Sequence, residues 1–135
     1  MNSVFMSILR RLKVMVVDDD PLVREIVRER LTRAGHQVIV RDSAIGTTQH
    51  VALEAPDVVL LDMQMPAISG VELAKMIRKG RTKQGTQVIF YTASEPDELV
   101  RLLGEAEAAR TLHKSMTERE FLQGFQLLTA RTAST

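Results

Sequence analysis

The sequence predicts a doubly wound α/β fold, in which a five-stranded parallel sheet is covered by helices on both faces. Two uninterrupted apolar runs, Val14–Val17 and Val58–Leu61, are typical of strands that are buried on both sides. Predicted strands alternate with segments whose apolar residues recur at helical spacing, and this alternation builds a parallel sheet. Both runs end in aspartate, at Asp18 and Asp62, at the edge where such sheets bind ligands.

The first strand leads into an acidic turn and then into an amphipathic helix. Asp18, Asp19 and Asp20 follow the strand directly. Pro21 suits the first helical position, with Asp20 as its N-cap. Apolar residues then recur on one face and charged residues on the other. Gly35 favours the end of this helix.

The second strand and helix are marked less clearly. Gln37–Val40 is a short apolar strand. The helix expected over about Ala44–Glu54 contains Gly46 and two threonines, which are poor helix formers. Pro56 closes this segment before the third strand begins.

The third strand is followed by a loop and a better-marked helix. Ser69 is expected to form a capping box with Glu72, and the helix to run to about Lys79 and end at Gly80. Its inward face would carry three apolar residues: Leu73, Ala74 and Ile77.

The fourth strand, Gln87–Thr92, precedes another predicted helix. Ser94 is expected to cap this helix, which begins near Glu95. The helix carries four apolar residues: Leu99, Leu102, Leu103 and Ala106.

The last strand and helix complete the pattern. The fifth strand, near Arg110–His113, is short and is predicted mainly from topology. Thr117 and Glu120 form a capping box that opens the last helix. One face of that helix carries Phe121, Leu122, Phe125 and Leu128.

Length and composition limit the classes of function. At 135 residues the chain suits one domain, expected over residues 12–130, with an N-terminal extension at 1–11 and a tail at 131–135. A net charge of +1 supplies no general affinity for nucleic acid or membranes. The absence of cysteine excludes thiolate metal sites and fits a reducing compartment. Since no apolar run approaches the roughly 20 residues of a membrane span, we expect a cytoplasmic protein.

Four strand ends bring polar groups to one rim of the sheet: Asp18 and Asp19, Asp62, Thr92, and Lys114. Three converging carboxylates repel one another, and a hard divalent cation relieves that repulsion. Oxygen ligands without histidine or cysteine favour Mg²⁺, or Mn²⁺, over Zn²⁺. A carboxylate can also attack phosphorus to form an aspartyl phosphate. An acidic turn before a helix is equally often a simple N-cap, so the combination of strand ends carries this hypothesis.

The residues resemble the receiver domain of bacterial two-component response regulators, from about Lys13 to Thr129. The Val-Val-Asp-Asp-Asp-Pro-Leu-Val-Arg segment resembles the acidic-pair motif of that family, and Leu-Leu-Asp-Met-Gln-Met-Pro-Ala-Ile-Ser-Gly resembles its phosphoacceptor motif. Thr92-Ala93 is similar to its switch hydroxyl and small neighbour, and Lys114 to its characteristic lysine. The resemblance implies a chemotaxis-regulator-like, flavodoxin-like (βα)5 fold of three α/β/α layers, with strand order 2-1-3-4-5.

The resemblance also implies the roles of the site residues. Asp62 would accept a phosphoryl group from a sensor histidine kinase or phosphotransfer protein, in a Mg²⁺-dependent reaction without enzymatic turnover. Asp19, Asp62 and the backbone carbonyl of Gln64 would bind the metal, with Asp18 helping through water. Gln64 and Ser94 correspond to positions that tune the access of hydrolytic water.

The implied output is a change in protein contacts. Thr92 and Lys114 would respond to the added charge and shift the fourth helix, fifth strand and fifth helix. That face would bind a downstream effector or a linked output domain, or pair two copies of the chain. No direct contact with nucleic acid or a membrane is expected.

Two residues depart from the family pattern. Ser115 stands where a proline in a cis Lys-Pro bond is usual, and a cis non-proline bond costs about 3–4 kcal/mol. We therefore expect a trans bond or a remodelled loop. Thr111 stands where a switch tyrosine or phenylalanine is common, and a threonine has no ring to swing.

Two other functions remain open from the sequence. Thr111 and Ser115 are compatible with a receiver-fold interaction module whose phosphorylation-driven switching is weak or absent. The third hypothesis is a Mg²⁺-dependent phosphohydrolase that turns over an aspartyl phosphate. It is disfavoured because Gln64 occupies the position two residues after Asp62 where a second catalytic acid would stand.

Overall fold

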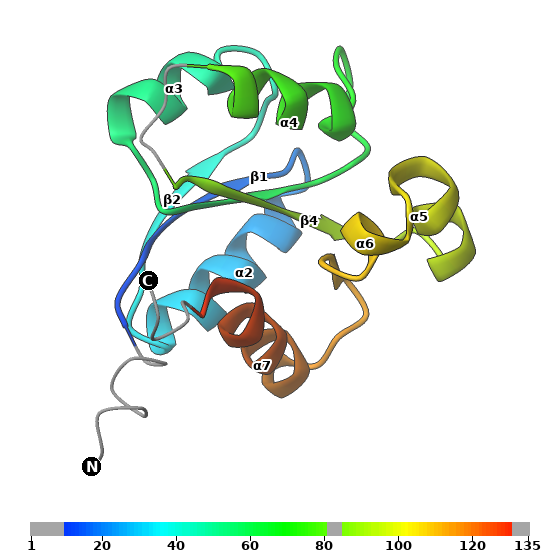
Figure 1. The fold of residues 1–135 in the computed structure, drawn as a ribbon. Helices are drawn as coiled ribbons and strands as arrows, with labels where there is room; N and C mark the ends of the chain where they lie inside the picture. Colours follow the sequence, from blue (N-terminus) through cyan, green and yellow to red (C-terminus); the bar gives the residue numbers. More distant parts are fainter. Residues whose placement is uncertain (1–9, 81–84, 131–135) are drawn as a thin grey trace.

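The computed structural model describes residues 10–80 and 85–130 and contains a five-stranded parallel sheet (Figure 1). The strand order β2-β1-β3-β4-β5 confirms the order implied by the family resemblance. The strands are β1 Lys13–Val17, β2 Gln37–Arg41, β3 Val58–Leu61, β4 Gln87–Thr92 and β5 Leu112–His113. The observed β5 is thus shorter than the strand predicted near Arg110–His113.

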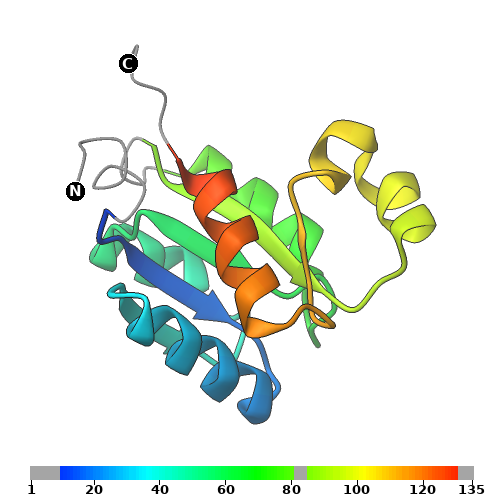
Figure 2. The same ribbon diagram turned by 90° about the horizontal axis from the view of Figure 1, so that it is seen from below.

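Helices cover both faces of the sheet, as predicted. They are α2 Pro21–Arg33, α3 Thr47–Glu54, α4 Gly70–Lys79, α5 Pro96–Leu103, α6 Glu105–Ala108 and α7 Glu118–Thr129. The pair α3 and α4 lies on one face, and α2 and α7 lie on the other (Figure 1). The short helices α5 and α6 project beyond the β5 end of the sheet (Figure 2).

Side chains of each central strand alternate between two apolar cores. Met15 and Val17 of β1 pack in the core beneath α3 and α4. Val14 and Val16 pack in the other core, against Phe121 of α7. Because a strand of this kind is covered on both sides, its sequence shows an unbroken apolar run rather than polar alternation.

Three of the predicted helix boundaries depend on side-chain caps. Asp20 caps α2 by accepting a hydrogen bond from the Leu22 N–H at 2.9 Å. Thr117 and Glu120 form the complete capping box expected at α7. At α4, Ser69 accepts from the Glu72 N–H, but the reciprocal half of the capping box is not found among the described residues. The capping-box prediction at α4 is therefore only half confirmed.

The helix expected from Ala44 begins later. Gly46 adopts a left-handed conformation with φ of 81°, so α3 starts at Thr47. The Thr47 hydroxyl donates to the Ser43 carbonyl at 2.8 Å and stabilises the preceding turn. Ala44 is buried in the core instead of opening the helix.

The helix after β4 begins near Glu95 as predicted, but the prediction is wrong about its cap and its continuity. Glu95, not Ser94, is the N-cap residue of α5. Gly104, with φ of 85°, separates α5 from α6, so Ala106 falls on the second, shorter helix. Of the apolar residues of α5, Leu99 is buried, whereas Leu102 is 54% exposed.

The two terminal segments proposed from the sequence lie largely outside the described residues. Only Arg10 and Arg11 of the expected extension at 1–11 are described, and none of the tail at 131–135. Among the described residues, no helix combines the length and apolarity that a membrane crossing requires.

A buried histidine joins β1 to α7. The Nδ1 atom of His36 accepts a hydrogen bond from the Leu12 N–H at 3.1 Å. The His36 ring meets Phe125 edge-on, with ring centroids 5.2 Å apart. Burial lowers the pKa of His36 below its usual value. Protonation of Nδ1 would also place its N–H against the Leu12 N–H, and two donors cannot form a hydrogen bond with each other.

We expect the free energy of unfolding to fall as the pH drops below about 6.5, because the unfolded chain then binds a proton that folded His36 resists. Above that pH both states are neutral and the effect vanishes. For one proton the slope is at most about 1.4 kcal/mol per pH unit. Urea unfolding between pH 5 and 8 should show a smaller dependence for His36→Asn than for the native chain. Identical pH dependence in the two proteins would contradict this.

Candidate functional site

Two carboxylates lie next to each other because their strands are neighbours. Asp18 follows β1 and Asp62 follows β3, and Val17 pairs with Leu61 in the parallel register. The Asp62 N–H donates to the Val17 carbonyl at 3.0 Å, and the Asp18 N–H donates at 3.1 Å to the carbonyl of Arg41, the last residue of β2. Backbone hydrogen bonds therefore hold both residues after their strands have ended.

Asp18, Asp19 and Asp62 form one carboxylate cluster. One oxygen from each lies within 4.8 Å of the others. Asp18 and Asp62 are only 2% and 6% exposed, whereas Asp19 is open to solvent. The structure thus brings together the three acids that the sequence placed at one rim.

Lys114 compensates the two buried charges. Its Nζ lies 2.9 Å from Oδ2 of Asp18 and 3.5 Å from Oδ1 of Asp62. The Lys114 N–H donates to the Thr92 carbonyl at 2.8 Å, which fixes the lysine backbone beside β4. The residue that follows the fifth strand therefore contributes directly to the carboxylate cluster.

The electrostatics of the cluster reflect burial as well as charge. Burial raises the pKa of Asp62, the Gln64 N–H opposes this, and the neighbouring Asp18 charge adds to the increase. Burial works to lower the pKa of Lys114, but the close contact with the Asp18 carboxylate and the charge of Asp62 outweigh it, so this pKa is raised. The lysine therefore remains an ammonium ion.

The oxygen atoms of the cluster suit a hard cation. Oδ2 of Asp18 is buried and, among the described residues, accepts no hydrogen bond of good geometry, although the Lys114 ammonium is in contact with it. Oδ1 of Asp18 accepts from the Asp20 N–H at 2.9 Å. Oxygen donors with spare lone pairs and no nearby sulfur fit Mg²⁺ or Mn²⁺.

Gln64 and Gly70 shape the loop after β3. The Gln64 N–H donates to Oδ1 of Asp62 at 3.2 Å, while the Gln64 side chain is exposed. Gly70 begins α4 so close to this loop that an added Cβ would lie 2.3 Å from the Asp62 carbonyl oxygen. A larger residue at position 70 would therefore displace the backbone that carries Asp62.

Thr92 lies at the end of β4, and its hydroxyl is engaged by Ser94. It donates to the Ser94 hydroxyl at 3.1 Å and accepts from the Ser94 N–H at 3.1 Å. Thr92 is 1% exposed, so this exchange of hydrogen bonds takes place in a nearly closed environment. Ser94 was expected to cap a helix, but it holds the Thr92 hydroxyl instead.

One residue of the site was missed by sequence reasoning. Arg24 looked like part of a solvated helix face, but its guanidinium donates to the Asp18 carbonyl at 2.8 Å. Its place one turn into α2, directly after the acidic turn, is the signal that was available. Arg24 therefore ties the start of α2 to the carboxylate cluster.

The loop after Lys114 is built without a cis peptide bond. None occurs among the described residues, in agreement with the expected trans bond before Ser115. The Nδ1 atom of His113 accepts from the Ser115 N–H at 3.0 Å and lies 2.6 Å from the Ser115 hydroxyl oxygen. A proline would have no N–H for this contact. His113 and Ser115 thus close a local turn directly around Lys114.

The sequence and the fold are similar to those of known regulators. Residues 14–126 match the family model of the response regulator receiver domain. The phosphate regulon transcriptional regulatory protein PhoB of Pseudomonas aeruginosa is 27% identical over 120 residues, covering 88% of this chain and 52% of PhoB. The response regulator MprA of Mycobacterium leprae is 30% identical over 122 residues, covering 90% of this chain and 52% of MprA. The chain thus spans about half the length of these curated relatives.

Among solved structures, the response regulator TrrA of Thermotoga maritima in complex with Mg²⁺-BeF is similar. The two share 28% identity with a TM-score of 0.73, over 86% of this chain and 97% of that one. The receiver domain of a CheY-like regulator from Methylobacillus flagellatus, at 18% identity and a TM-score of 0.73, covers 88% of this chain and 99% of its own, and supports the fold alone.

Replacing His113 with alanine should lower the free energy of unfolding by about 1 kcal/mol, because the Ser115 N–H loses its acceptor. His113→Asn should recover part of this loss, since its amide oxygen can accept from the same N–H. Urea unfolding measures both, with His50→Ala on the exposed face of α3 as the matched control. Equal losses for the alanine and asparagine variants would assign the effect to packing.

Proposed function

The chain belongs to the response regulator receiver domain family, and we propose that it accepts a phosphoryl group on Asp62 and acts as a signalling switch. One observation carries the proposal: the Lys114 ammonium contacts both buried carboxylates, at 2.9 Å from Asp18 and 3.5 Å from Asp62. Phosphoryl transfer depends on positioned groups that stabilise charge on the phosphoryl oxygens. Lys114 supplies one such group beside the acceptor.

The contacts of Asp62 suggest which oxygen attacks. Oδ1 accepts from the Gln64 N–H and faces the Lys114 ammonium. This leaves Oδ2 as the nucleophile. It would form an oxygen–phosphorus bond as the phosphorus–nitrogen bond of a phosphohistidine donor breaks, and the donor imidazole would leave with the electron pair. The Lys114 ammonium would then neutralise part of the charge on the acyl phosphate.

We propose that Asp18, Asp19, Asp62 and the Gln64 carbonyl hold Mg²⁺, or Mn²⁺, during transfer. The cluster of three carboxylates supports this, as does the Mg²⁺-BeF complex of the related TrrA receiver. The metal would supply positive charge for the phosphoryl oxygens. Asp18 and Asp19 would offer carboxylate oxygens to the metal. The hydrogen bond from Arg24 fixes the backbone of Asp18.

We further propose that phosphorylation changes the face formed by α5, β5 and α7. The Thr92 hydroxyl would exchange its Ser94 partner for a phosphoryl oxygen, and this movement would reach β5 through the Lys114–Thr92 backbone contact. The face would then bind a downstream effector or linked output domain, or pair two copies. The donor would be a cytoplasmic histidine kinase or phosphotransfer protein.

The alternative of an interaction module with weak switching rests on a specific observation. Thr111 carries no aromatic ring, and its hydroxyl already donates to the Ala108 carbonyl at 2.7 Å. A side chain that is small and locally bonded offers little movement to transmit. In this alternative, phosphorylation-driven switching is weak or absent, and neither proposal involves enzymatic turnover.

Incubation with acetyl phosphate and Mg²⁺ should add one phosphoryl group to the protein, detected by intact mass. Asp62→Asn should abolish the adduct, because its amide is a far weaker nucleophile. Asp97→Asn, in the exposed first turn of α5, removes one charge elsewhere and should leave the adduct intact. A folded native protein without an adduct would favour the interaction module. Continuous phosphate release over many turnovers would favour the hydrolase.

Mg²⁺ should raise the melting temperature, because an ion that binds the folded state stabilises it by mass action. Asp19→Asn should reduce this shift and weaken apparent affinity by about tenfold or more. Asp19 is exposed, so the substitution should change the metal-free melting temperature little. Asp97→Asn again serves as the matched control. Equal Mg²⁺ responses for the two variants would argue against a metal ligand at position 19.

A further inference from the structure

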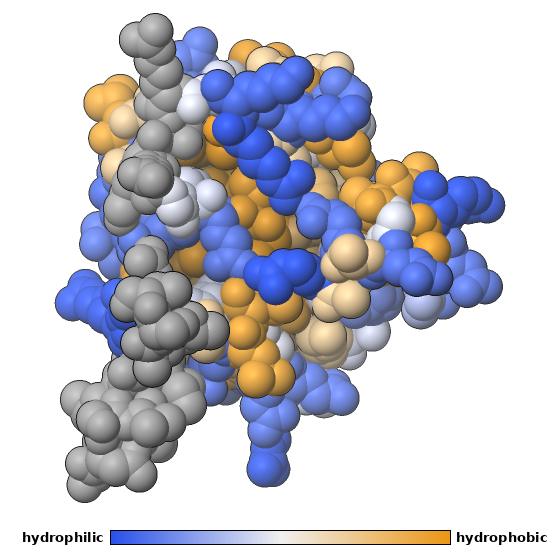
Figure 3. All heavy atoms as spheres, viewed as in Figure 1, coloured by the Kyte–Doolittle hydropathy of each residue, from blue (hydrophilic) through white to orange (hydrophobic). Residues whose placement is uncertain are grey.

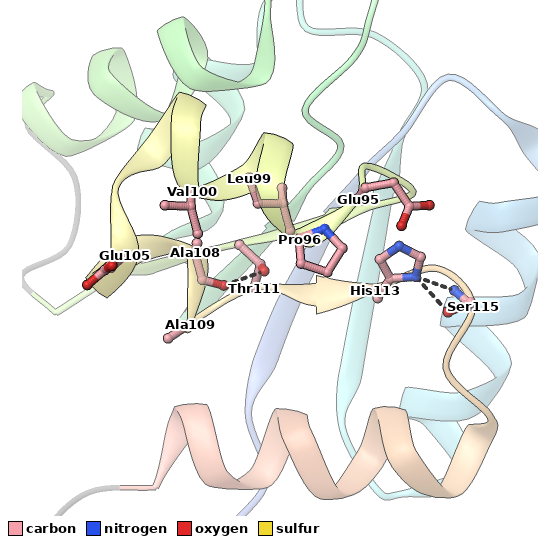
Figure 4. Close-up of a pocket in the computed structure, with 10 residues that line it drawn as sticks. All are labelled: Glu95, Pro96, Leu99, Val100, Glu105, Ala108, Ala109, Thr111, His113 and Ser115. Carbon is pink, nitrogen blue, oxygen red and sulfur yellow. Dashed lines mark hydrogen bonds between the residues drawn. The ribbon is translucent and has the colours of Figure 1, made fainter.

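A pocket of about 580 Å³ opens between α5, α6 and β5 (Figure 4). Its lining is mainly apolar and includes Leu99 and Val100 from α5 and Ala108 from α6. Thr111, directly before β5, also lines the pocket and lies next to Ala108 (Figure 4). A volume of this size is typical of sites that hold a ligand or a partner side chain.

The helices beside the pocket bury few side chains completely, although Leu103 and Ala108 pack partly against the core and Glu107 forms a salt bridge with Arg78 of α4. Leu99 is the single buried residue of α5, and α6 has none. Val100 is 41% exposed at the pocket wall. Thr111 donates its hydroxyl to the Ala108 carbonyl, so an incoming group meets apolar surface rather than a free hydroxyl.

The pocket has an acidic rim. Glu95 and Glu105 line it at opposite ends, both are exposed, and neither forms a salt bridge with any described residue. Asp97 and Glu98 add two further acids in the first turn of α5, whereas Arg101 is the only basic residue of α5 and α6. In the space-filling view, apolar and strongly polar side chains adjoin one another over these helices (Figure 3).

We propose that this pocket binds a basic peptide segment of a partner protein, through a bulky apolar side chain flanked by lysine or arginine. The apolar walls would bury the anchor side chain, and the unpaired rim acids would face the flanking cations. An open pocket with charge only at its rim suits a side chain on a peptide. Small-molecule sites usually combine enclosure with convergent polar groups.

Binding at this pocket does not require phosphoryl transfer. The pocket is already open while Thr92 is bonded to Ser94. It shares the α5–β5 surface with the proposed switch, so phosphorylation would tune an existing contact instead of creating it. The inference and the proposed function therefore fail under different experimental results.

The test uses ¹⁵N-labelled full chain titrated with two synthetic amidated peptides. One has a central Phe-Leu pair between two lysines on either side, and the other replaces the lysines with glutamates. The basic peptide should shift amide resonances of residues 95–115, and the acidic peptide should bind at least about tenfold more weakly. Thr111→Phe fills the pocket and Glu105→Lys reverses the rim charge, and each should weaken binding by about tenfold or more.

Matched variants separate the pocket from the phosphoacceptor site. Glu29→Lys makes the same charge change on α2, where Glu29 has only a 4.0 Å contact with Arg33, and should bind the basic peptide normally. Asp62→Asn should also bind normally, because the pocket does not depend on the adduct. If Thr111→Phe fails to fold, the substitution Glu105→Lys at an exposed position still tests whether the rim charge contributes to peptide binding.

Four outcomes would overturn the proposal. They are equal binding of both peptides, no binding of the basic peptide at millimolar concentration, resonance shifts confined to other surfaces, and loss of binding in Asp62→Asn alone. Concentration-dependent shifts of residues 95–115 without peptide would assign the pocket to a second copy of this chain. Acetyl phosphate labelling of Thr111→Phe and Glu105→Lys should remain at the native level, which tests the phosphoacceptor independently.

Discussion

The contact of one ammonium with two buried carboxylates is the constraint on which the site depends. Parallel pairing of β1 with β3 places Asp18 beside Asp62, and these two charges would repel if nothing stood between them. Lys114 reaches them from beyond β5, two strands away from β3. The charge balance of the cluster therefore depends on the strand order, because the acids follow β1 and β3 and their counter-ion follows β5.

The sequence predicts most of the sheet because each central strand is covered on both faces, and double burial leaves an unbroken apolar run. It also predicts the acids and Lys114, because side chains that follow parallel strands share one rim. It fails at the helix after β4. Gly104 divides that segment into two helices, and Ser94 bonds Thr92 instead of capping. The break at Gly104 and the bonding of Ser94 depend on neighbours in the folded structure, which a local sequence pattern does not contain.

Contacts between distant parts of the fold could not be predicted from the sequence for the same reason. The approach of Arg24 to the Asp18 carbonyl requires the turn between β1 and α2 to be folded, and helical spacing alone assigns Arg24 to solvent. The turn at Ser115 was expected to be trans, but the acceptor that stabilises it, His113, carried no signal. In both places a side chain bonds to backbone near the site, and the backbone geometry exists only in the folded chain.

The break at Gly104 separates chemistry from recognition along the chain. The acids and Lys114 are held by the ends of strands in the sheet, whereas α5 and α6 contribute one fully buried side chain, Leu99, and pack Leu103 and Ala108 only partly against the core. The exposed positions of such a segment can accept new side chains at little cost to the global stability. Partner choice can therefore diversify by substitutions between residues 95 and 111, while the carboxylates and their counter-ion keep their arrangement. Under the proposed function, the partner surface can thus change while the phosphoacceptor site stays the same.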